Sequence, residues 1–214
     1  MHTILFDMDG VLINSEPVII QAATRALAEV GITATREFFE PFIGAGEEFF
    51  IIGPCKDAGI PEKTGAVMAA MYQNYNDAVY QELAVYPYAA ETIKALHNAG
   101  VTLALVSSSA REKLLISLDA AKIPAECFDL ILSGSDVTKK KPDPEPYLKA
   151  AEKLGKDPKD CLVIEDALNG IKAAKAAGMQ CGAVTTSFPE DALLDAGADM
   201  ILKGLDDILN VIHL

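Results

Sequence analysis

The sequence predicts an α/β fold: a doubly wound, Rossmann-like parallel sheet with an all-helical cap inserted near its start. The first observation is a short apolar run at residues 4–6, which is typical of a strand buried on both faces of a parallel sheet. The second is the alternation of strand-like and helical segments from residue 89 onward, which indicates parallel strands covered by helices. The third is the stretch between them, about 70 residues of helical periodicity, which is too long for a simple crossover.

The insertion is expected over residues 15–83, which leaves residues 1–14 and 84–214 for the core. Its first helix is predicted over residues 18–30, with Asn14 or Ser15 able to cap it. Glycine and proline breaks divide the rest, and we expect no strand there.

Beyond a linker at residues 86–88, strands and helices alternate. The strands are predicted over residues 101–106, 130–132, 161–164, 180–184 and 200–202. The helices are predicted over residues 89–98, 110–121, 144–154, 168–177, 191–196 and 205–212.

Composition and charge narrow the range of partners. Half of the 214 residues are hydrophobic and 23% are charged, so the chain is not intrinsically disordered. The 18 basic and 31 acidic residues give a formal net charge of −13, which argues against binding to nucleic acid or an anionic membrane. We expect a monomer that binds a small anionic molecule through local cations.

The four cysteines are scattered without a C-x-x-C pair, so they predict neither a zinc site nor a disulfide framework. No signal-peptide pattern precedes Asp7, and no apolar run approaches the roughly 18 residues of a membrane span. We therefore expect a cytoplasmic protein.

Two carboxylates, Asp7 and Asp9, directly follow the first strand, at the sheet edge where open α/β folds bind ligands. Because the two repel each other, they suggest a counter-ion, and Mg²⁺ is the natural candidate since it prefers hard oxygen ligands. Gly10 would let the backbone turn away beneath them. The alternative is an ordinary acidic turn at Asp9 and Gly10, and the spacing alone leaves both open.

Polar clusters also follow other strands, and parallel strands should bring all of them to one edge. Beside the aspartate pair they are Ser107–Ser109, Lys141, and Glu165 with Asp166. Taken singly, each has an ordinary explanation: a helix cap, a solvated basic loop, or an acidic helix start. Their joint occurrence in this order is harder to explain by helix ends.

The combination meets the needs of phosphoryl transfer to a carboxylate. A carboxylate nucleophile and a phosphate dianion repel each other, so cations and hydroxyl donors must neutralise the phosphate oxygens. Lys141 can supply positive charge and Ser107 a hydrogen bond. Asp9 is left to protonate the leaving oxygen and then to act as a base toward water.

Four motifs carry a family resemblance over essentially the whole chain: Asp7-Met8-Asp9-Gly10-Val11, Ser107, Lys141-Pro142 and Glu165-Asp166-Ala167-Leu168-Asn169-Gly170. Together they resemble the haloacid-dehalogenase superfamily of phosphotransferases. The chain is similar to the branch that contains β-phosphoglucomutase and phosphoglycolate-type phosphatases, which carry a helical cap between the first two motifs.

The resemblance implies that Asp7 becomes an aspartyl-phosphate and that Asp9 is the general acid and base. It also implies a Mg²⁺ ion held by the Asp7 side chain, the Asp9 carbonyl and Asp166, with Glu165 supporting or sharing the ion. Ala167 stands where a serine is common beside this site.

Ser107 and Lys141 would hold the phosphoryl group, according to the same resemblance. Contacts with the substrate are expected from eight residues: Gly10, Ser15, Gly44, Glu47, Ser108, Ser109, Arg111 and Asn169. The sequence does not identify the substrate.

Departures from the family pattern favour hydrolysis. Dehalogenases of this superfamily lack the Mg²⁺ site and the second aspartate, so the presence of Asp9 argues against dehalogenation. Mutases acting on hexose phosphates carry basic residues where this chain has Ile43 and Glu47, and a histidine where it has Ile19. A second phosphate would therefore meet a carboxylate at Glu47, unless the glycine-rich loop before it turns that side chain into solvent.

We expect a Mg²⁺-dependent phosphatase that hydrolyses a small phosphorylated metabolite. A phosphosugar mutase, which would pass the phosphoryl group to a second hydroxyl, is the alternative enzyme. The alternative outside the enzymes is a binding or regulatory protein that keeps the fold but has no catalytic activity.

Overall fold

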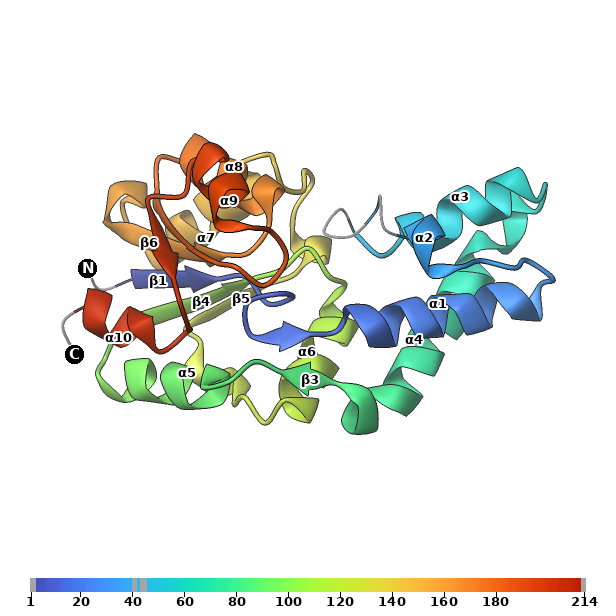
Figure 1. Ribbon diagram of the computed structural model, residues 1–214, viewed down its shortest axis with the longest axis horizontal. Coiled ribbons are helices and arrows are strands. Elements are labelled where there is room, and N and C mark those ends of the chain that lie inside the picture. The colour runs from blue at the N-terminus through green and yellow to red at the C-terminus, as the bar shows by residue number, and fades with distance from the viewer. Residues whose placement is uncertain (1–2, 40–41, 43–45, 213–214) are drawn as a thin grey trace.

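The computed structural model describes residues 3–39, 42 and 46–212. Its centre is a six-stranded parallel sheet in the order β5-β4-β1-β6-β7-β8 (Figure 1). The strands are β1 (Thr3–Phe6), β4 (Thr102–Val106), β5 (Leu130–Leu132), β6 (Cys161–Glu165), β7 (Gln180–Val184) and β8 (Met200–Leu202). The chain proceeds outward in opposite directions on the two sides of β1, so the end of β1 is the switch point where such sheets bind ligands. The predicted doubly wound sheet is confirmed.

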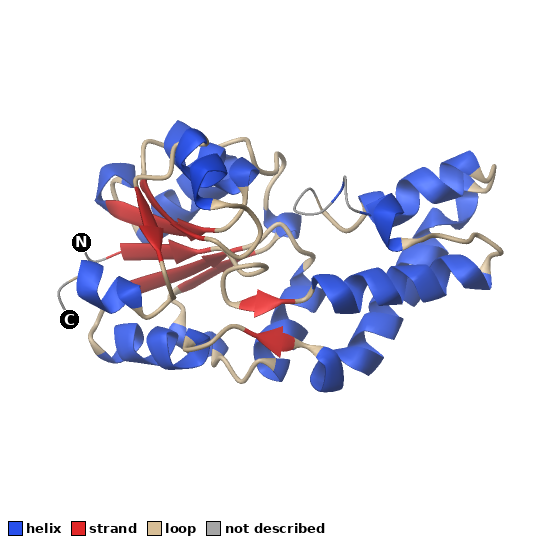
Figure 2. Cartoon of the chain, viewed as in Figure 1, coloured by secondary structure: helices blue, strands red, loops and turns tan. Residues whose placement is uncertain are grey.

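Helices cover both faces of the sheet (Figure 2). One face carries α5 (Ala89–Asn98), α6 (Arg111–Ala120) and α10 (Asp207–Val211), and the other carries α7 (Glu145–Leu154), α8 (Leu168–Ala176) and α9 (Glu190–Asp195). In β1, Ile4 and Phe6 pack into the first layer and Leu5 into the second, because successive strand side chains point to opposite faces. A strand covered on both sides needs an apolar residue at every such position, which explains the run that predicted it.

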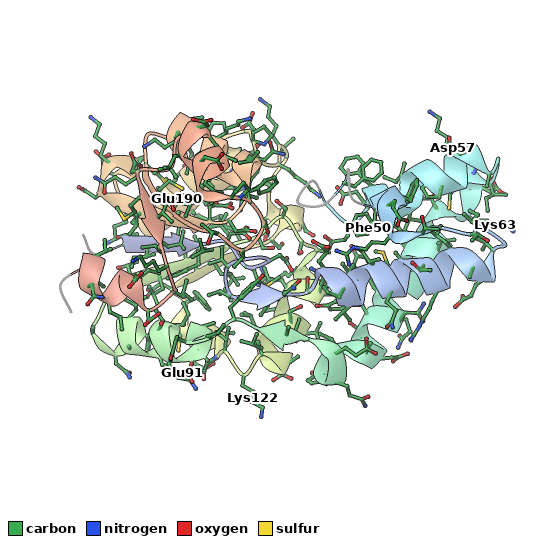
Figure 3. All side chains as sticks on the ribbon, viewed as in Figure 1. Phe50, Asp57, Lys63, Glu91, Lys122 and Glu190 are labelled. Atoms are coloured by element: carbon green, nitrogen blue, oxygen red, sulfur yellow. The ribbon has the colours of Figure 1, made fainter. Side chains whose placement is uncertain are left out.

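The inserted segment forms an apolar cluster of its own beyond the end of the sheet. We call it the cap cluster; it consists of α1 (Glu16–Glu29), α2 (Arg36–Phe39), α3 (Phe49–Asp57) and α4 (Thr64–Glu82). Phe50 is 4% exposed inside it, whereas Asp57 and Lys63 lie toward its outer end (Figure 3). The Tyr75 hydroxyl of α4 and the Ser117 hydroxyl of α6 lie 2.8 Å apart, which joins the cluster to the core.

Two short strands that the sequence did not predict join the insertion to the core. β2 (Ile13–Asn14) and β3 (Ala84–Val85) pair antiparallel, so both connections run side by side (Figure 1). Strands of two residues are too short to show any periodicity in the sequence. The predicted side-chain cap of the first helix is wrong, because Ser15 stands at the N-cap without a capping bond.

Element boundaries differ from the prediction by a few residues. The first helix begins at Glu16, because Pro17 fits in its first turn, and the last begins at Asp207. Among the described helices, none combines the length and apolarity needed to cross a bilayer.

Candidate active site

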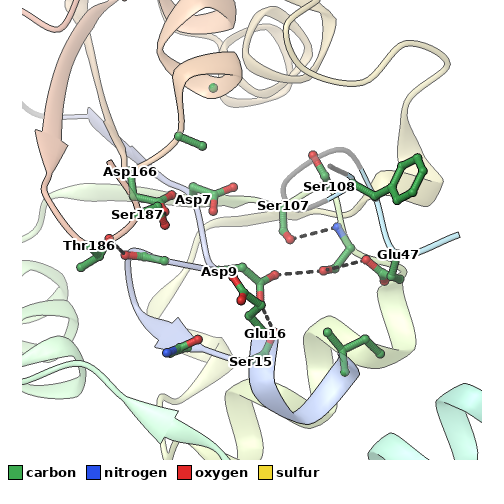
Figure 4. Close-up of a pocket in the computed structure, with 18 of the residues that line it drawn as sticks. Asp7, Asp9, Ser15, Glu16, Glu47, Ser107, Ser108, Asp166, Thr186 and Ser187 are labelled. Carbon is green, nitrogen blue, oxygen red and sulfur yellow. Dashed lines mark hydrogen bonds between the residues drawn. The ribbon is translucent and has the colours of Figure 1, made fainter. Parts of the chain in front are cut away.

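The polar strand ends meet at one edge of the sheet (Figure 4). Asp7 follows β1, Ser107 follows β4 and Asp166 follows β6. Backbone bonding continues one residue past two of these strands: the Asp7 N–H donates to the Ile164 carbonyl and the Ser107 N–H to the Leu132 carbonyl, both at 3.0 Å. These two bonds hold the backbone of Asp7 and Ser107 in place at the sheet edge. The predicted convergence of the polar side chains therefore follows from the geometry of the strands.

Lys141, in the loop before α7, is the buried cation of this edge. Its Nζ donates to Asp7 Oδ1 at 2.5 Å, to Glu165 Oε1 at 2.7 Å and to the Val106 carbonyl at 3.1 Å. Burial alone would lower the pKa of Lys141, but the two carboxylates outweigh it and raise that pKa, so the ammonium stays charged. Its three acceptors hold the charge beside Asp7.

Glu165 is 1% exposed, and protein donors satisfy both of its oxygens. Oε1 accepts from the Tyr147 hydroxyl at 2.7 Å as well as from the lysine, and Oε2 accepts the backbone N–H groups of Asp166 and Ala167 at 3.1 and 3.2 Å. Gly170 of α8 provides the space for this carboxylate, because a Cβ at that position would overlap the Glu165 carboxylate. This carboxylate therefore orients its neighbours, and any further ligand would compete with these four hydrogen bonds.

Asp7, Glu165 and Asp166 form a cluster that could bind a metal ion. Each offers a carboxylate oxygen, and these atoms lie within 4.8 Å of one another. Burial, only partly offset by Lys141, raises the pKa of Asp7 to about 7, and burial together with the other two acids raises the pKa of Asp166 well above its usual value. One ammonium does not balance three buried carboxylates, so a divalent cation with oxygen ligands fits the excess charge.

Gly10 lies under this cluster with a φ of +88°, and a Cβ there would overlap the Asp166 carboxylate. The predicted turn at Gly10 is thus required twice, by backbone conformation and by space. The Thr186 hydroxyl donates to the Gly10 carbonyl at 2.5 Å, and the Ser187 hydroxyl donates to the Asp166 carboxylate. The loop after β7 therefore supports the acidic cluster.

Asp9 points to a separate group of partners on the side of the cap cluster. The Ser109 hydroxyl donates to Oδ2 at 3.0 Å, Lys113 Nζ lies 3.1 and 3.2 Å from the two oxygens, and the Ser15 hydroxyl also donates to Oδ1. Burial would raise the pKa of Asp9, but Lys113 and these hydrogen bonds outweigh it and hold that pKa below its usual value. The carboxylate form of Asp9 is thereby stabilised.

A cavity of about 510 Å³ extends from the sheet edge to the cap cluster. It is lined by eleven of the predicted site residues: Asp7, Asp9, Gly10, Ser15, Glu47, Ser107, Ser108, Ser109, Lys141, Glu165 and Asp166. Within the described chain, two predicted residues are absent from its lining: Arg111 is half-exposed and lies 3.6 Å from Asp136, and Asn169 is exposed. Gly44 and Ile43 lie outside the described residues.

Two side chains take orientations that the sequence left open. Ser107 Oγ accepts the Ser109 N–H at 3.1 Å, and its own proton has no acceptor among residues 3–39, 42 and 46–212. Glu47 is 8% exposed and lies against the core near Ser107–Ser109 (Figure 4), so it does not point into solvent. Both side chains face the cavity.

Sequence reasoning missed Lys113, Tyr147 and the Thr186–Ser187 pair. The sequence contained a signal for Lys113, which stands four residues after Ser109 and next to the apolar Leu114. It is therefore a lysine on the buried face of its helix. The hydroxyls after β7 gave no signal, since serine and threonine are ordinary loop residues.

A sequence pattern of known proteins decides the family. The pattern described as haloacid dehalogenase-like hydrolase matches residues 4–184. The chain belongs to this family. The phosphoglycolate phosphatase of Nitrosospira multiformis is 30% identical to this hydrolase over 219 residues, which cover 100% of this chain and 96% of that one. The named resemblance is therefore confirmed.

Solved structures agree with that assignment. CbbY from Rhodobacter sphaeroides, in complex with phosphate, matches this hydrolase with a TM-score of 0.86 and 27% identity over 100% of both chains. The protein SUPPRESSOR OF QUENCHING 1, chloroplastic, from Arabidopsis thaliana is 38% identical over 217 residues. That match covers 99% of this chain and 20% of the relative, so the chain spans a fifth of that relative's length.

Proposed function

We propose that the protein is a Mg²⁺-dependent phosphatase that hydrolyses a small phosphorylated metabolite through an aspartyl-phosphate on Asp7. The observation that carries the proposal is the 2.5 Å ion pair of Asp7 with the buried Lys141, at the edge of a cavity of about 510 Å³. A carboxylate can attack a phosphate ester where a fixed cation offsets the charge of the phosphate. The family and the phosphate bound by CbbY support this choice.

The side chains of Asp7 and Asp166 and the carbonyl of Asp9 would hold the Mg²⁺ ion. Glu165 would support the site without binding the ion, because its two oxygens already accept four hydrogen bonds. When bound, the ion supplies positive charge that reduces the repulsion between the nucleophile and the phosphate.

In the first step, an Asp7 oxygen forms a bond to phosphorus while the ester P–O bond breaks. Lys141 and the hydroxyl proton of Ser107 hold phosphoryl oxygens. Asp9 must be protonated for this step, against the lowering of its pKa by Lys113; it gives that proton to the leaving oxygen and takes one back from water in the second step. In the second step, water attacks phosphorus and gives its proton to Asp9. The Asp7 carboxylate and inorganic phosphate are then released, and Lys113 keeps the Asp9 carboxylate aligned throughout.

Residues 15–83 serve as a cap over a core of residues 1–14 and 84–214 in this proposal. The separate apolar cluster of α1–α4 supports the division. So does the cavity, whose far wall includes Phe42, Gly46, Glu47 and Phe50. A cap seated over the cavity limits the access of bulk water to the attacking carboxylate.

A panel of small phosphate monoesters at saturating Mg²⁺, with released phosphate measured, tests the proposal. We expect the wild type to hydrolyse several of them and the Asp7→Asn variant to hydrolyse none. Equal release by both proteins, or absence of a beryllofluoride adduct at Asp7, would contradict it. Incubation with β-glucose 1-phosphate separates the mutase alternative: free phosphate supports hydrolysis, and glucose 6-phosphate supports the mutase.

A further inference from the structure

Glu47 is a buried carboxylate in the wall of the cavity opposite the acidic cluster. It is 8% exposed, it lines the cavity, and it lies against the loop that follows β4 (Figure 4). Its two oxygens have different surroundings. Oε1 accepts a hydrogen bond of 3.0 Å from the N–H of Ala110, at the N-terminus of α6. It also accepts a longer one, of 3.4 Å, from the Tyr72 hydroxyl.

Oε2 has only one neighbour of donor type in the described chain, the Ser109 hydroxyl at 3.5 Å. A hydroxyl carries a single proton, and Ser109 lies closer to Asp9, at 3.0 Å, so it donates there. Lys113 donates to Ser109 Oγ and to Asp9. Over residues 3–39, 42 and 46–212, Glu47 forms no ion pair within 4.0 Å, although its charge helps to raise the pKa of the nearby Lys113. Among these described residues, the Ser109 hydroxyl at 3.5 Å is thus the nearest donor to Oε2.

A carboxylate oxygen whose nearest donor lies at 3.5 Å retains capacity for a stronger hydrogen bond. The α6 N-terminus offsets part of the cost of burying the charge at Oε1. The Glu47 side chain lines the cavity in which the organic half of a ligand would lie when its phosphate is next to Asp7. A ligand that brings a hydrogen-bond donor to this side chain satisfies the carboxylate, whereas a ligand that brings a second anion is repelled.

We propose that Glu47 selects phosphate monoesters whose organic half carries a hydrogen-bond donor, a hydroxyl or an ammonium group, and no second anion. This inference rests on the proposed phosphatase function and narrows its substrates. It disfavours esters that end in a carboxylate, such as phosphoglycolate, and sugar bisphosphates. At about 4 Å, the repulsion corresponds to roughly one to three powers of ten in affinity, depending on the water left in the cavity.

Four esters of equal chain length test the inference: propyl, 3-hydroxypropyl, 3-aminopropyl and 2-carboxyethyl phosphate. For the wild type we expect kcat/KM to be at least about tenfold higher for the hydroxy and amino esters than for the carboxy ester. In the Glu47→Gln variant this ratio should fall close to one, because the amide oxygen still accepts from Ala110 but the charge is gone. The amino ester should lose more than the hydroxy ester if its ammonium is the better partner.

Glu48→Gln is the matched control, because Glu48 pairs with Lys140 and is not part of the cavity lining. It should keep the wild-type ranking of the four esters. The inference is overturned if Glu47→Gln keeps that ranking too, or if the carboxy ester is the best wild-type substrate. If the wild type hydrolyses none of the four esters, the result would instead count against the phosphatase function.

Calorimetric binding of the same esters to the Asp7→Asn variant gives the ranking without turnover. There the hydroxy and amino esters should bind at least about tenfold more tightly than the carboxy ester. Equal affinities would refute the role of Glu47 even if no ester were hydrolysed.

Discussion

The two ends of the cavity are held in different ways. At the sheet end, Asp7 and Asp166 directly follow strands, and Lys141 bonds to the last carbonyl of β4. At the cap end, Glu47 comes from a segment without a strand and contacts the core through one strong backbone bond, from Ala110. The comparison teaches that strands fix the side chains to which we assign bond making. Glu47, which we propose contacts the rest of the ligand, lies on a segment that can change without disturbing those strands.

The largest effect should come from the nucleophile at the sheet end. Asp7→Asn removes the attacking charge but keeps the shape of the side chain, so turnover should fall by about three or more powers of ten. Circular dichroism and thermal unfolding should show that the fold persists. If turnover by Asp7→Asn stays within tenfold of the wild type, Asp7 is not the nucleophile.

The acidic cluster should depend on a metal ion. Asp166→Ala should abolish turnover and also the upward shift of Tm that Mg²⁺ gives the wild type, because a ligand that binds only the native state stabilises it. Glu165→Gln should weaken Mg²⁺ binding by only about 10- to 100-fold, since its role is supporting. Full activity in excess EDTA would rule out the metal site.

Lys113 joins the two ends, since it is buried and pairs with Asp9. Lys113→Met should lower kcat/KM by about 10- to 100-fold through misplacement of Asp9. It should also lower the free energy of unfolding by about 1 to 2 kcal/mol, because the Asp9 carboxylate, 34% exposed, loses its cation. Lys175→Met is the control: Lys175 pairs with Asp199 at 2.6 Å on the surface and should change stability by less than about 1 kcal/mol. Equal losses of activity in both variants would deny Lys113 a special role.

The smallest effect should come from the Lys140–Glu48 ion pair between the loop before α7 and the cap cluster. Both side chains keep about a quarter of their surface exposed, at 28% and 26%. Lys140→Ala should therefore change kcat/KM by less than about threefold, and high salt should have a similarly small effect on the wild type. A loss as large as that of Lys113→Met would show that this pair controls the approach of the cap.

The sheet end of the site could be predicted because its residues follow strands, and strands are visible as apolar runs. Asp7 and Ser107 directly follow such runs, Asp166 follows one after Glu165, and parallel strands bring their ends to one edge. The cap end could not be predicted in the same way. Whether Glu47 points inward depends on how a helix of the core meets a loop of the insertion, which no local pattern records.

Arg111 shows the limit of reasoning from position alone. It lies next to Ala110, whose N–H reaches the site, but its own side chain lies toward Asp136 at 3.6 Å. At the start of a helix, adjacent residues point about 100° apart, so closeness in the sequence did not place Arg111 in the cavity. Lys113, three residues from Ala110, does reach it.

Gly170 has a practical consequence for protein engineering. It stands inside α8, where exchanging glycine for alanine ordinarily raises stability by up to about 1 kcal/mol. Software or a consensus library that searches for stabilising substitutions would choose this position early. The added methyl group would displace the Glu165 carboxylate, and with it the charge beside the nucleophile. A variant selected for heat resistance alone could therefore keep its fold and lose its chemistry, so thermal screens of this protein need an activity measurement beside them.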